Sequence, residues 1–214
     1  MITLFQASDD DLLRRIREGD ERAFMVLYRR RQGMVYRFAL RMTGRESLAE
    51  EVTQEAFMAL IREAGKYDSA RGPVASYLYG ITRNIILQCL RREAGYVPLS
   101  EVDGDGEHTL AAKSTGGAIA LWDPLEDLAR AEAVAQVQRA VLALPAKYRE
   151  VIALCELEGL DYAAAGAALG APIGTVRSRL HRARALLLAK LRAHEARGPA
   201  PAPKLAARPC GGQA

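Results

Sequence analysis

The strongest candidate for a chemical function is a basic segment at residues 161–188, DYAAAGAALGAPIGTVRSRLHRARALLL. Asp161 is a good N-cap for a short helix of small residues, and Gly170 can supply the left-handed backbone that ends such a helix. In the helix that follows, apolar residues recur at helical spacing, at Val176, Leu180, Ala183 and Leu187. Two helices with a tight turn between them predict a helix-turn-helix motif, whose second helix can enter the major groove of DNA.

The other face of that second helix is polar and basic. Residues 175–192 contain six Lys or Arg and no acid. Arginine can bond guanine edges or phosphates, and serine can reach either. A basic run alone is more often a solvated surface, but its combination with the glycine turn and the small first helix favours DNA binding. The candidate DNA-binding residues are Arg177, Ser178, Arg179, His181, Arg182 and Arg184.

A second group of residues forms an acidic face. Glu51, Gln54 and Glu55 are three and four residues apart, so they share one side of a helix. Residues 46–63 hold five acids against one base, Arg62. DNA phosphates would repel this face, so it is either solvated or bound by a basic protein partner. Taken alone, the residues favour the solvated surface by about two to one.

A third segment, residues 66–92, combines tyrosines with arginines and has no acid after Asp68. Aromatic rings stack on unpaired bases and arginines follow the backbone, so this composition suits single-stranded nucleic acid. Partly buried tyrosines in a helical core are an equally good interpretation. The candidate binding residues are Tyr67, Arg71, Tyr77, Tyr79, Arg83 and Asn84. Four apolar residues are assigned to the core, namely Leu78, Ile81, Ile85 and Leu90.

Helical periodicity without strand-like alternation predicts an all-α fold with two small domains, residues 8–92 and 126–195. Residues 93–125 contain clusters of Gly, Ser, Thr and Asp without a sustained period, which predicts a flexible linker. Residues 196–214 are rich in Gly, Ala and Pro and are expected to be a disordered tail.

Capping signals indicate where the helices begin and end. Ser8 with Asp11 and Ser47 with Glu50 are capping pairs, and Gly44 ends the helix between them. The predicted helices include residues 21–43, a helix that begins at Ser47, residues 74–92, 126–144, 147–157 and 161–169, and a last helix that begins near Thr175.

Composition narrows the class of protein. The chain has 214 residues and a net charge of +4, and it lacks both a signal-like N-terminus and an apolar run of the ~18 residues that a membrane span needs. Its three cysteines, Cys89, Cys155 and Cys210, are widely spaced. There is no phosphate-binding glycine loop and no cluster with metal-ligand spacing. We therefore expect a cytoplasmic protein with no metal, cofactor, membrane insertion or enzymatic activity.

The motifs, in this order, resemble those of the bacterial extracytoplasmic-function (ECF) sigma factors, which are the smallest members of the sigma-70 family. The resemblance covers about residues 9–92 and 126–192. It rests on DDLLRRIREGDERAF at 10–24, EEVTQEAF at 50–57, YLYGITRN at 77–84 and GAPIGTVRSRLHRAR at 170–184. It implies two helical domains on a flexible linker, a region 2-like domain and a region 4-like domain with the helix-turn-helix.

The resemblance also implies a role for each of the three segments. The acidic face would bind the β′ clamp helices of core RNA polymerase through Leu48, Glu51, Gln54 and Glu55. The tyrosine and arginine segment would capture the −10 element and help to open the duplex, with a flipped base held between Arg71 and Ser76. The last helix would read the −35 element, with bases facing Ser178, His181 and Arg182.

The implied function is promoter-specific transcription initiation with core polymerase, including its β flap, under the control of an anti-sigma factor. Tyr77 stands where the family usually has Trp, and Gln88 where an acid is common. Two other classes remain open on the residues alone. One is a helix-turn-helix repressor or activator, and the other is a helical interaction scaffold that does not bind DNA.

Overall fold

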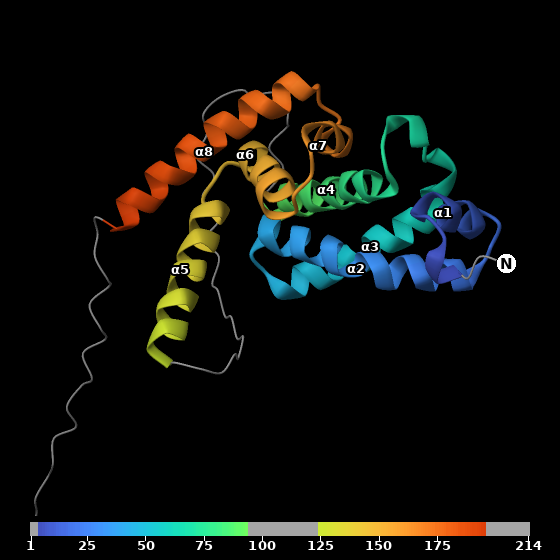
Figure 1. Ribbon diagram of the computed structural model, residues 1–214, viewed down its shortest axis with the longest axis horizontal. Coiled ribbons are helices and arrows are strands. Elements are labelled where there is room, and N and C mark those ends of the chain that lie inside the picture. The colour runs from blue at the N-terminus through green and yellow to red at the C-terminus, as the bar shows by residue number, and fades with distance from the viewer. Residues whose placement is uncertain (1–3, 94–123, 196–214) are drawn as a thin grey trace, which may run out of the picture.

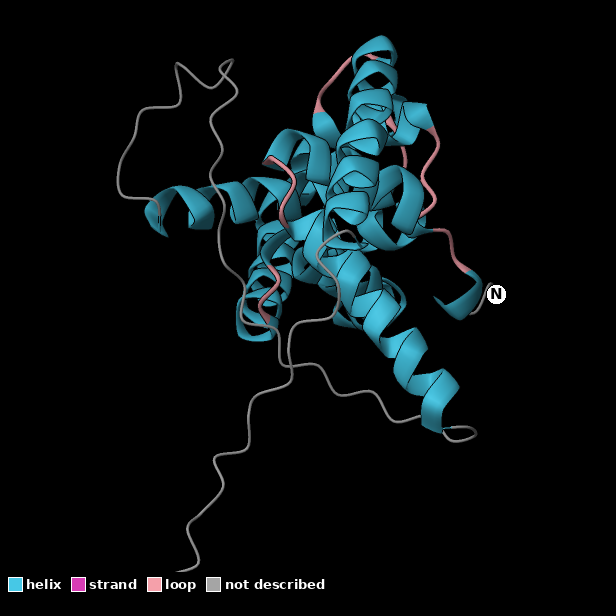
Figure 2. Ribbon diagram, turned by 90° about the vertical axis from the view of Figure 1, so that its left-hand side faces the viewer, coloured by secondary structure: helices cyan, strands magenta, loops and turns pink. Residues whose placement is uncertain are grey.

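The computed structural model describes residues 4–93, here the N-terminal domain, and residues 124–195, here the C-terminal domain. Every regular element in these two stretches is a helix, which confirms the all-α prediction (Figure 2). Most of the predicted linker and the whole predicted tail lie outside the described residues. The N-terminal domain contains η1 (Leu4–Gln6), α1 (Asp9–Arg17), α2 (Glu21–Thr43), α3 (Glu46–Glu63), η2 (Ala64–Lys66), η3 (Ser69–Arg71) and α4 (Val74–Glu93). The C-terminal domain contains α5 (Pro124–Leu142), α6 (Ala146–Val151), the π-helical turn η5 (Ile152–Leu157), α7 (Tyr162–Leu169) and α8 (Ile173–Glu195).

Two of the three predicted capping signals in the N-terminal domain are confirmed. The Ser8 hydroxyl accepts a hydrogen bond from the Asp11 backbone N–H at the start of α1, and Gly44 ends α2 with a φ of 69°. The Ser47 cap is wrong, because α3 begins one residue earlier and Arg45 is its N-cap without a side-chain bond. Gly44 turns the chain so tightly that only Arg45 separates it from α3.

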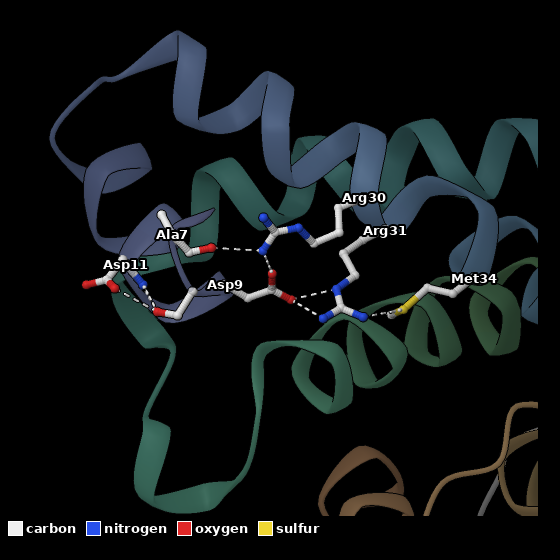
Figure 3. Close-up of polar contacts among 7 residues, drawn as sticks. Ala7, Asp9, Asp11, Arg30, Arg31 and Met34 are labelled. Atoms are coloured by element: carbon white, nitrogen blue, oxygen red, sulfur yellow. Dashed lines mark hydrogen bonds and ion pairs between the residues drawn. The ribbon is translucent and has the colours of Figure 1, made fainter. Parts of the chain in front are cut away.

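The Asp9 carboxylate links α1 to α2 through two ion pairs (Figure 3). Asp9 accepts hydrogen bonds from Arg30 Nη1 at 2.6 Å and from Arg31 Nε at 2.5 Å. Its side chain is 10% exposed, so both ion pairs are partly shielded from water. Asp9 also lies in the first turn of α1, where a negative charge interacts favourably with the free N–H groups. These contacts fix how α1 lies across the bundle.

The core of the N-terminal domain lies between α2, α3 and α4. The rings of Phe24 and Tyr28 pack edge-on against Phe57, with ring centroids 6.3 and 4.8 Å away. Phe38 on α2 is fully buried. Ile61, at the far end of α3, is 42% exposed and lies outside this core. Of the four predicted core residues on α4, Leu78 and Ile81 are buried, and Ile85 and Leu90 are partly buried.

Two helices of the C-terminal domain differ from the predicted ones. The predicted helix 126–144 ends at Leu142, and the predicted helix 147–157 divides into α6 and the π-helical turn η5.

Arg149 connects several elements of the C-terminal domain. The guanidinium of Arg149 is buried and donates hydrogen bonds to the carbonyls of Leu142, Leu144 and Met42. It thus bonds carbonyls at the ends of α5 and α2 that have no helical partner. Burial lowers the pKa of Arg149 below its ordinary value.

The two domains pack against each other, which the sequence did not predict (Figure 1). Helix α7 packs against α4, and the C-terminal domain also contacts α2 through α5, α6 and η5. The approach is close at two glycines. A Cβ atom on Gly80 would lie 3.2 Å from the carbonyl oxygen of Ala168, and one on Gly72 would lie 3.0 Å from Cβ of Ala167. These glycines let α7 approach the N-terminal domain closely.

Phe57 and Met58 provide a matched test of this packing, since they are neighbours on α3 with exposed fractions of 2% and 52%. Phe57→Ala should lower the free energy of unfolding by about 3–5 kcal/mol, because it leaves a cavity in the aromatic cluster. Met58→Ala should change it by less than about 0.5 kcal/mol. Urea unfolding followed by circular dichroism measures both, and equal effects would contradict the assigned core.

Candidate nucleic-acid interface

The structure forms the helix-turn-helix as the sequence predicted. Asp161 accepts a hydrogen bond from the Ala164 N–H at 2.7 Å and caps α7, and Gly170 ends α7 with a φ of 61°. The apolar stripe of α8 faces inward, with Val176, Leu180 and Ala183 buried and Leu187 partly buried. The polar face of α8 therefore points outward. The helix begins at Ile173, two residues before the predicted start.

Five of the six predicted residues on α8 are exposed. Arg184 is one of them, and the other four are Arg177, Ser178, His181 and Arg182. The Arg177 guanidinium lies 5.8 Å from the centre of the Tyr162 ring, which holds it beside the turn. Ser178 Oγ donates a hydrogen bond to the Thr175 carbonyl at 3.0 Å. These contacts are local, so all four side chains remain accessible to a ligand as large as duplex DNA.

Two of the predicted residues are paired with carboxylates of their own domain. Arg179 Nη1 lies 3.6 Å from Glu150 Oε1. Arg184 Nε donates to Glu156 Oε1 at 3.1 Å, and this bond raises the pKa of Arg184 above its ordinary value. Both arginines flank the exposed face, so release from these carboxylates would allow them to contact phosphates.

The acidic face on α3 is exposed at Glu51, Gln54 and Glu55. Leu48 does not belong to it, because only 6% of Leu48 is exposed and its side chain packs in the core. Its role in a contact surface stays a prediction, and in this conformation it follows the inward stripe of α3. The sequence did not indicate that basic residues of α2 lie across a groove from this acidic face. A groove between α2 and α3 is lined by Glu50 and Gln54 on one helix and by the arginines of α2 on the other, Arg29, Arg30, Arg31 and Arg37.

The loop before α4 is built around two tyrosines. The rings of Tyr67 and Tyr77 lie 5.5 Å apart, and both are partly buried. The Tyr67 hydroxyl lies within hydrogen-bonding distance of the Asp10 carboxylate and the Gly72 carbonyl, and Tyr77 donates to the Glu63 carbonyl at 3.0 Å. Burial raises the pKa of both tyrosines, more than the neighbouring acids do. Tyr67 and Tyr77 thus shape the loop, whereas Arg71 on η3 and Asn84 on α4 are exposed.

Three predicted −10 residues are covered. Ser76 and Tyr79 face the packed side of α4 and are each 2% exposed, so neither is accessible to DNA in this conformation. Their contact with the −10 element stays a prediction. The Tyr79 hydroxyl donates to Glu158 Oε2 at 3.0 Å, and Arg83 Nε donates to Glu150 Oε2 at 2.6 Å. Burial, followed by the charge of Glu158, raises the pKa of Tyr79.

Sequence reasoning missed the acids that hold Tyr79 and Arg83. Glu150 and Glu158 lie in a part of the chain that was interpreted only as helix and turn. Their partners lie far away in the sequence, so helical spacing carried no signal for them. Arg37 and Arg41, which also bond to Glu158, were missed for the same reason.

Each domain matches a known family model. Residues 27–95 match Sigma-70 region 2, and residues 135–187 match Sigma-70, region 4. The chain is 35% identical over 182 residues to the ECF RNA polymerase sigma-E factor of Escherichia coli (strain K12), which covers 84% of this chain and 92% of that protein. The chain belongs to the ECF sigma factors of the sigma-70 family. The N-terminal domain therefore carries region 2 and the C-terminal domain carries region 4.

Other ECF sigma factors are also similar to this chain. The sigma factor is 29% identical to the ECF sigma factor SigW of Bacillus subtilis (strain 168), over 84% of this chain and 95% of that protein. It is 33% identical to SigE of Mycolicibacterium smegmatis, of which it spans 61%. Sigma factors act in transcription initiation and are not enzymes. Membership in the family confirms the predicted function class and sets aside the repressor and scaffold alternatives.

Solved structures share the fold. CnrH, in complex with the cytosolic domain of CnrY, matches with a TM-score of 0.60 and 25% identity over 87% of this chain and 99% of that one. RpoE of Bartonella quintana, in complex with the anti-sigma factor NepR, matches with a TM-score of 0.59 and 24% identity over 79% and 96%. Within the described ranges of this sigma factor, no helix is long and apolar enough to cross a membrane. The same residues contain no group of three or more His, Cys, Asp or Glu that could hold a metal ion.

Two glycines test how the helix-turn-helix is packed. A Cβ on Gly166 would lie 2.9 Å from the carbonyl oxygen of Ala171 in the turn, whereas nothing lies within 4 Å of a Cβ on Gly174. Gly166→Ala should destabilise the protein by about 1–3 kcal/mol through overpacking. Gly174→Ala should stabilise it by about 0.4–1 kcal/mol, because it restricts the unfolded chain. Urea unfolding measures both, and a neutral Gly166→Ala would show that the turn is looser than described.

Proposed function

We propose that region 2 of this sigma factor binds core RNA polymerase and the −10 element, and that region 4 reads the −35 element in duplex DNA. The observation that carries this proposal is the exposed face of α8, which presents two arginines, a serine and a histidine directly after the helix-turn-helix turn. An exposed helix of this kind fits the major groove. Because the polymerase-binding and DNA-binding surfaces belong to one chain, the sigma factor brings polymerase and promoter together.

The polymerase-binding surface is proposed to be the exposed face of α3, with Glu51, Gln54 and Glu55 against the β′ clamp helices. Leu48 supports this face from beneath through its packing in the core. The arginines across the α2–α3 groove make the surface mixed in charge, which favours a protein partner over a nucleic acid. The β flap is the second polymerase contact that the family resemblance implies, and it would be made by region 4.

For the −10 element, Arg71 and Asn84 are the accessible residues of the predicted set. Tyr67 and Tyr77 hold the loop between α3 and α4 in shape, and a flipped base would be bound at that loop. Tyr79 and Arg83 lie under region 4, and Ser76 is buried on the same helix. They can join the site after the domains move apart.

An anti-sigma factor is the remaining proposed partner. RpoE of Bartonella quintana, which shares the fold, has been solved with the anti-sigma factor NepR. A partner of this kind would cover the exposed faces of α3 and α8 and keep the protein from polymerase and DNA. Since polymerase and chromosome are in the cytoplasm of a bacterium, we place its activity there.

Run-off transcription tests the proposed function directly. Purified sigma factor with core RNA polymerase should produce transcripts from a subset of genomic fragments, and core polymerase alone should produce none from the same fragments. A sigma factor that binds these fragments without polymerase and never supports transcription would refute the proposal.

The polymerase interface is tested by a double charge change. Gln54→Lys with Glu55→Lys should abolish binding to core polymerase, because two cations would face the basic clamp surface. Folding should be unaffected, since Glu55 and its partner Arg62 are each about half exposed and such pairs contribute little. Fluorescence anisotropy with labelled sigma factor measures the affinity.

The control for this experiment is Gln6→Lys with Glu18→Lys, which makes the same change in net charge at two exposed positions outside α3. It should bind polymerase as the parent does. Equal binding by both double variants would remove the α3 face from the interface.

The reading helix is tested at two arginines. Arg182→Ala should weaken binding to a promoter found by run-off transcription by about 1–3 kcal/mol, and should relax base preference, if Arg182 bonds a base with two hydrogen bonds. Arg184→Ala should weaken binding to all sequences alike, because Arg184 flanks the face and is assigned to phosphate. Gel-shift titrations with matched and scrambled −35 duplexes distinguish these outcomes. A uniform loss in Arg182→Ala would assign it to the backbone instead.

A further inference from the structure

The contact between the domains joins an acid of region 4 to cations of region 2. Glu158, directly after η5, accepts hydrogen bonds from Arg37 Nη2 at 3.2 Å, from Arg41 Nη1 and from the Tyr79 hydroxyl at 3.0 Å. All three donors lie on α2 or α4, and only 4% of the Glu158 side chain is exposed. The Glu158 carboxylate of the C-terminal domain thus accepts hydrogen bonds from three donors of the N-terminal domain.

Glu150 makes a similar contact beside it. Its side chain is 2% exposed and accepts hydrogen bonds from Arg83 on α4, while Arg179 of α8 lies within ion-pair distance. Two arginines that are candidates for DNA binding are therefore neutralised by one internal acid. Both acids belong to the layer of region 4 that lies against α2 and α4 (Figure 1).

Separation of the domains would leave Glu158 without these partners and would leave Glu150 paired with Arg179 alone. A buried carboxylate is stable only when it is paired, so Glu150 and Glu158 must return to water if region 4 moves away. On region 2, the same movement frees the guanidinium groups of Arg37 and Arg41 and the Tyr79 hydroxyl, which converge on one point. Charged donors arranged in this way bind the oxygens of a phosphate group well.

We propose that Arg37, Arg41 and Tyr79 form a phosphate site of region 2, which Glu158 occupies while the domains are docked. When the domains separate, the site binds a phosphodiester group of promoter DNA. Docking and DNA binding then compete for the same donors. This proposal rests on the proposed function, in which region 2 binds DNA, and it adds two arginines of α2 to that surface.

The packing around the site requires separation for DNA to enter. Gly80 and Ala168 place the backbones of α4 and α7 in direct contact, as the 3.2 Å approach of a Cβ on Gly80 shows. Tyr79, the neighbour of Gly80, is 2% exposed. No nucleotide can reach Tyr79 between these helices, so DNA can replace Glu158 only after α7 has moved.

The test compares Glu158→Gln with Glu132→Gln, which removes the same charge at an exposed position of α5. Small-angle X-ray scattering gives the radius of gyration, and fluorescence anisotropy gives the affinity for a labelled single-stranded oligothymidylate of about 20 nucleotides. Glu158→Gln should enlarge the radius and bind the oligonucleotide more tightly. The slope of log affinity against log salt should steepen by roughly 0.7 for each freed arginine that contacts a phosphate. Glu132→Gln should change neither quantity.

Two further variants separate the parts of the proposal. Arg41→Ala in the Glu158→Gln background should remove most of the gain in affinity without reducing the radius. Glu158→Arg should open the domains, and Arg41→Glu in that background should close them again by restoring an ion pair.

Three outcomes would overturn the proposal. They are a larger radius without a gain in affinity, a gain that survives Arg41→Ala, and an unchanged radius in Glu158→Arg. None of them depends on polymerase. If only the proposed function is wrong, the variants will still open and bind the oligonucleotide, but no variant will support run-off transcription.

Discussion

The arrangement of this protein depends on two carboxylates that are almost fully removed from water. Glu150 and Glu158 are each less than 5% exposed, and each is neutralised by arginines from another part of the chain. Removing one partner of such a pair leaves an uncompensated buried charge, which typically costs about 3–5 kcal/mol. The docked state is therefore specific, because sliding or rotating the domains would break pairs before new ones could form. Arg149 adds to this specificity, since it bonds carbonyls of both domains.

Region 4 combines this docked face with a free one. Its helix-turn-helix depends on small residues, because Gly166 lies against the turn and Ala183 lies in the inward stripe of α8. The exposed side of α8 can bind DNA while the opposite layer of the domain contacts region 2. Arg179 is the exception, since it belongs to α8 and is paired with Glu150 of the docked face. Helix α8 is thus linked to the domain contact through a single ion pair.

The helices could largely be predicted from the sequence, whereas the burial of several predicted contact residues could not. Helical period and capping rules placed the helices, because they depend on residues three or four apart. The turn at Gly170 was predictable for the same reason. Leu48, Ser76 and Tyr79 were assigned to contact surfaces by type and motif, but their burial depends on which side of a helix meets another element. The pairing of Tyr79 with Glu158 spans 79 residues, and no local pattern carries such information.

We infer that this one chain links core polymerase to promoter DNA through two domains that must separate to do so. The most direct measurement is energy transfer between dyes attached to cysteines at Glu21 on α2 and Ala193 on α8, in a variant whose native cysteines are serine. Separation predicts a fall in transfer efficiency when core polymerase binds, with no need for DNA. An unchanged efficiency in a complex that initiates transcription would contradict the claim.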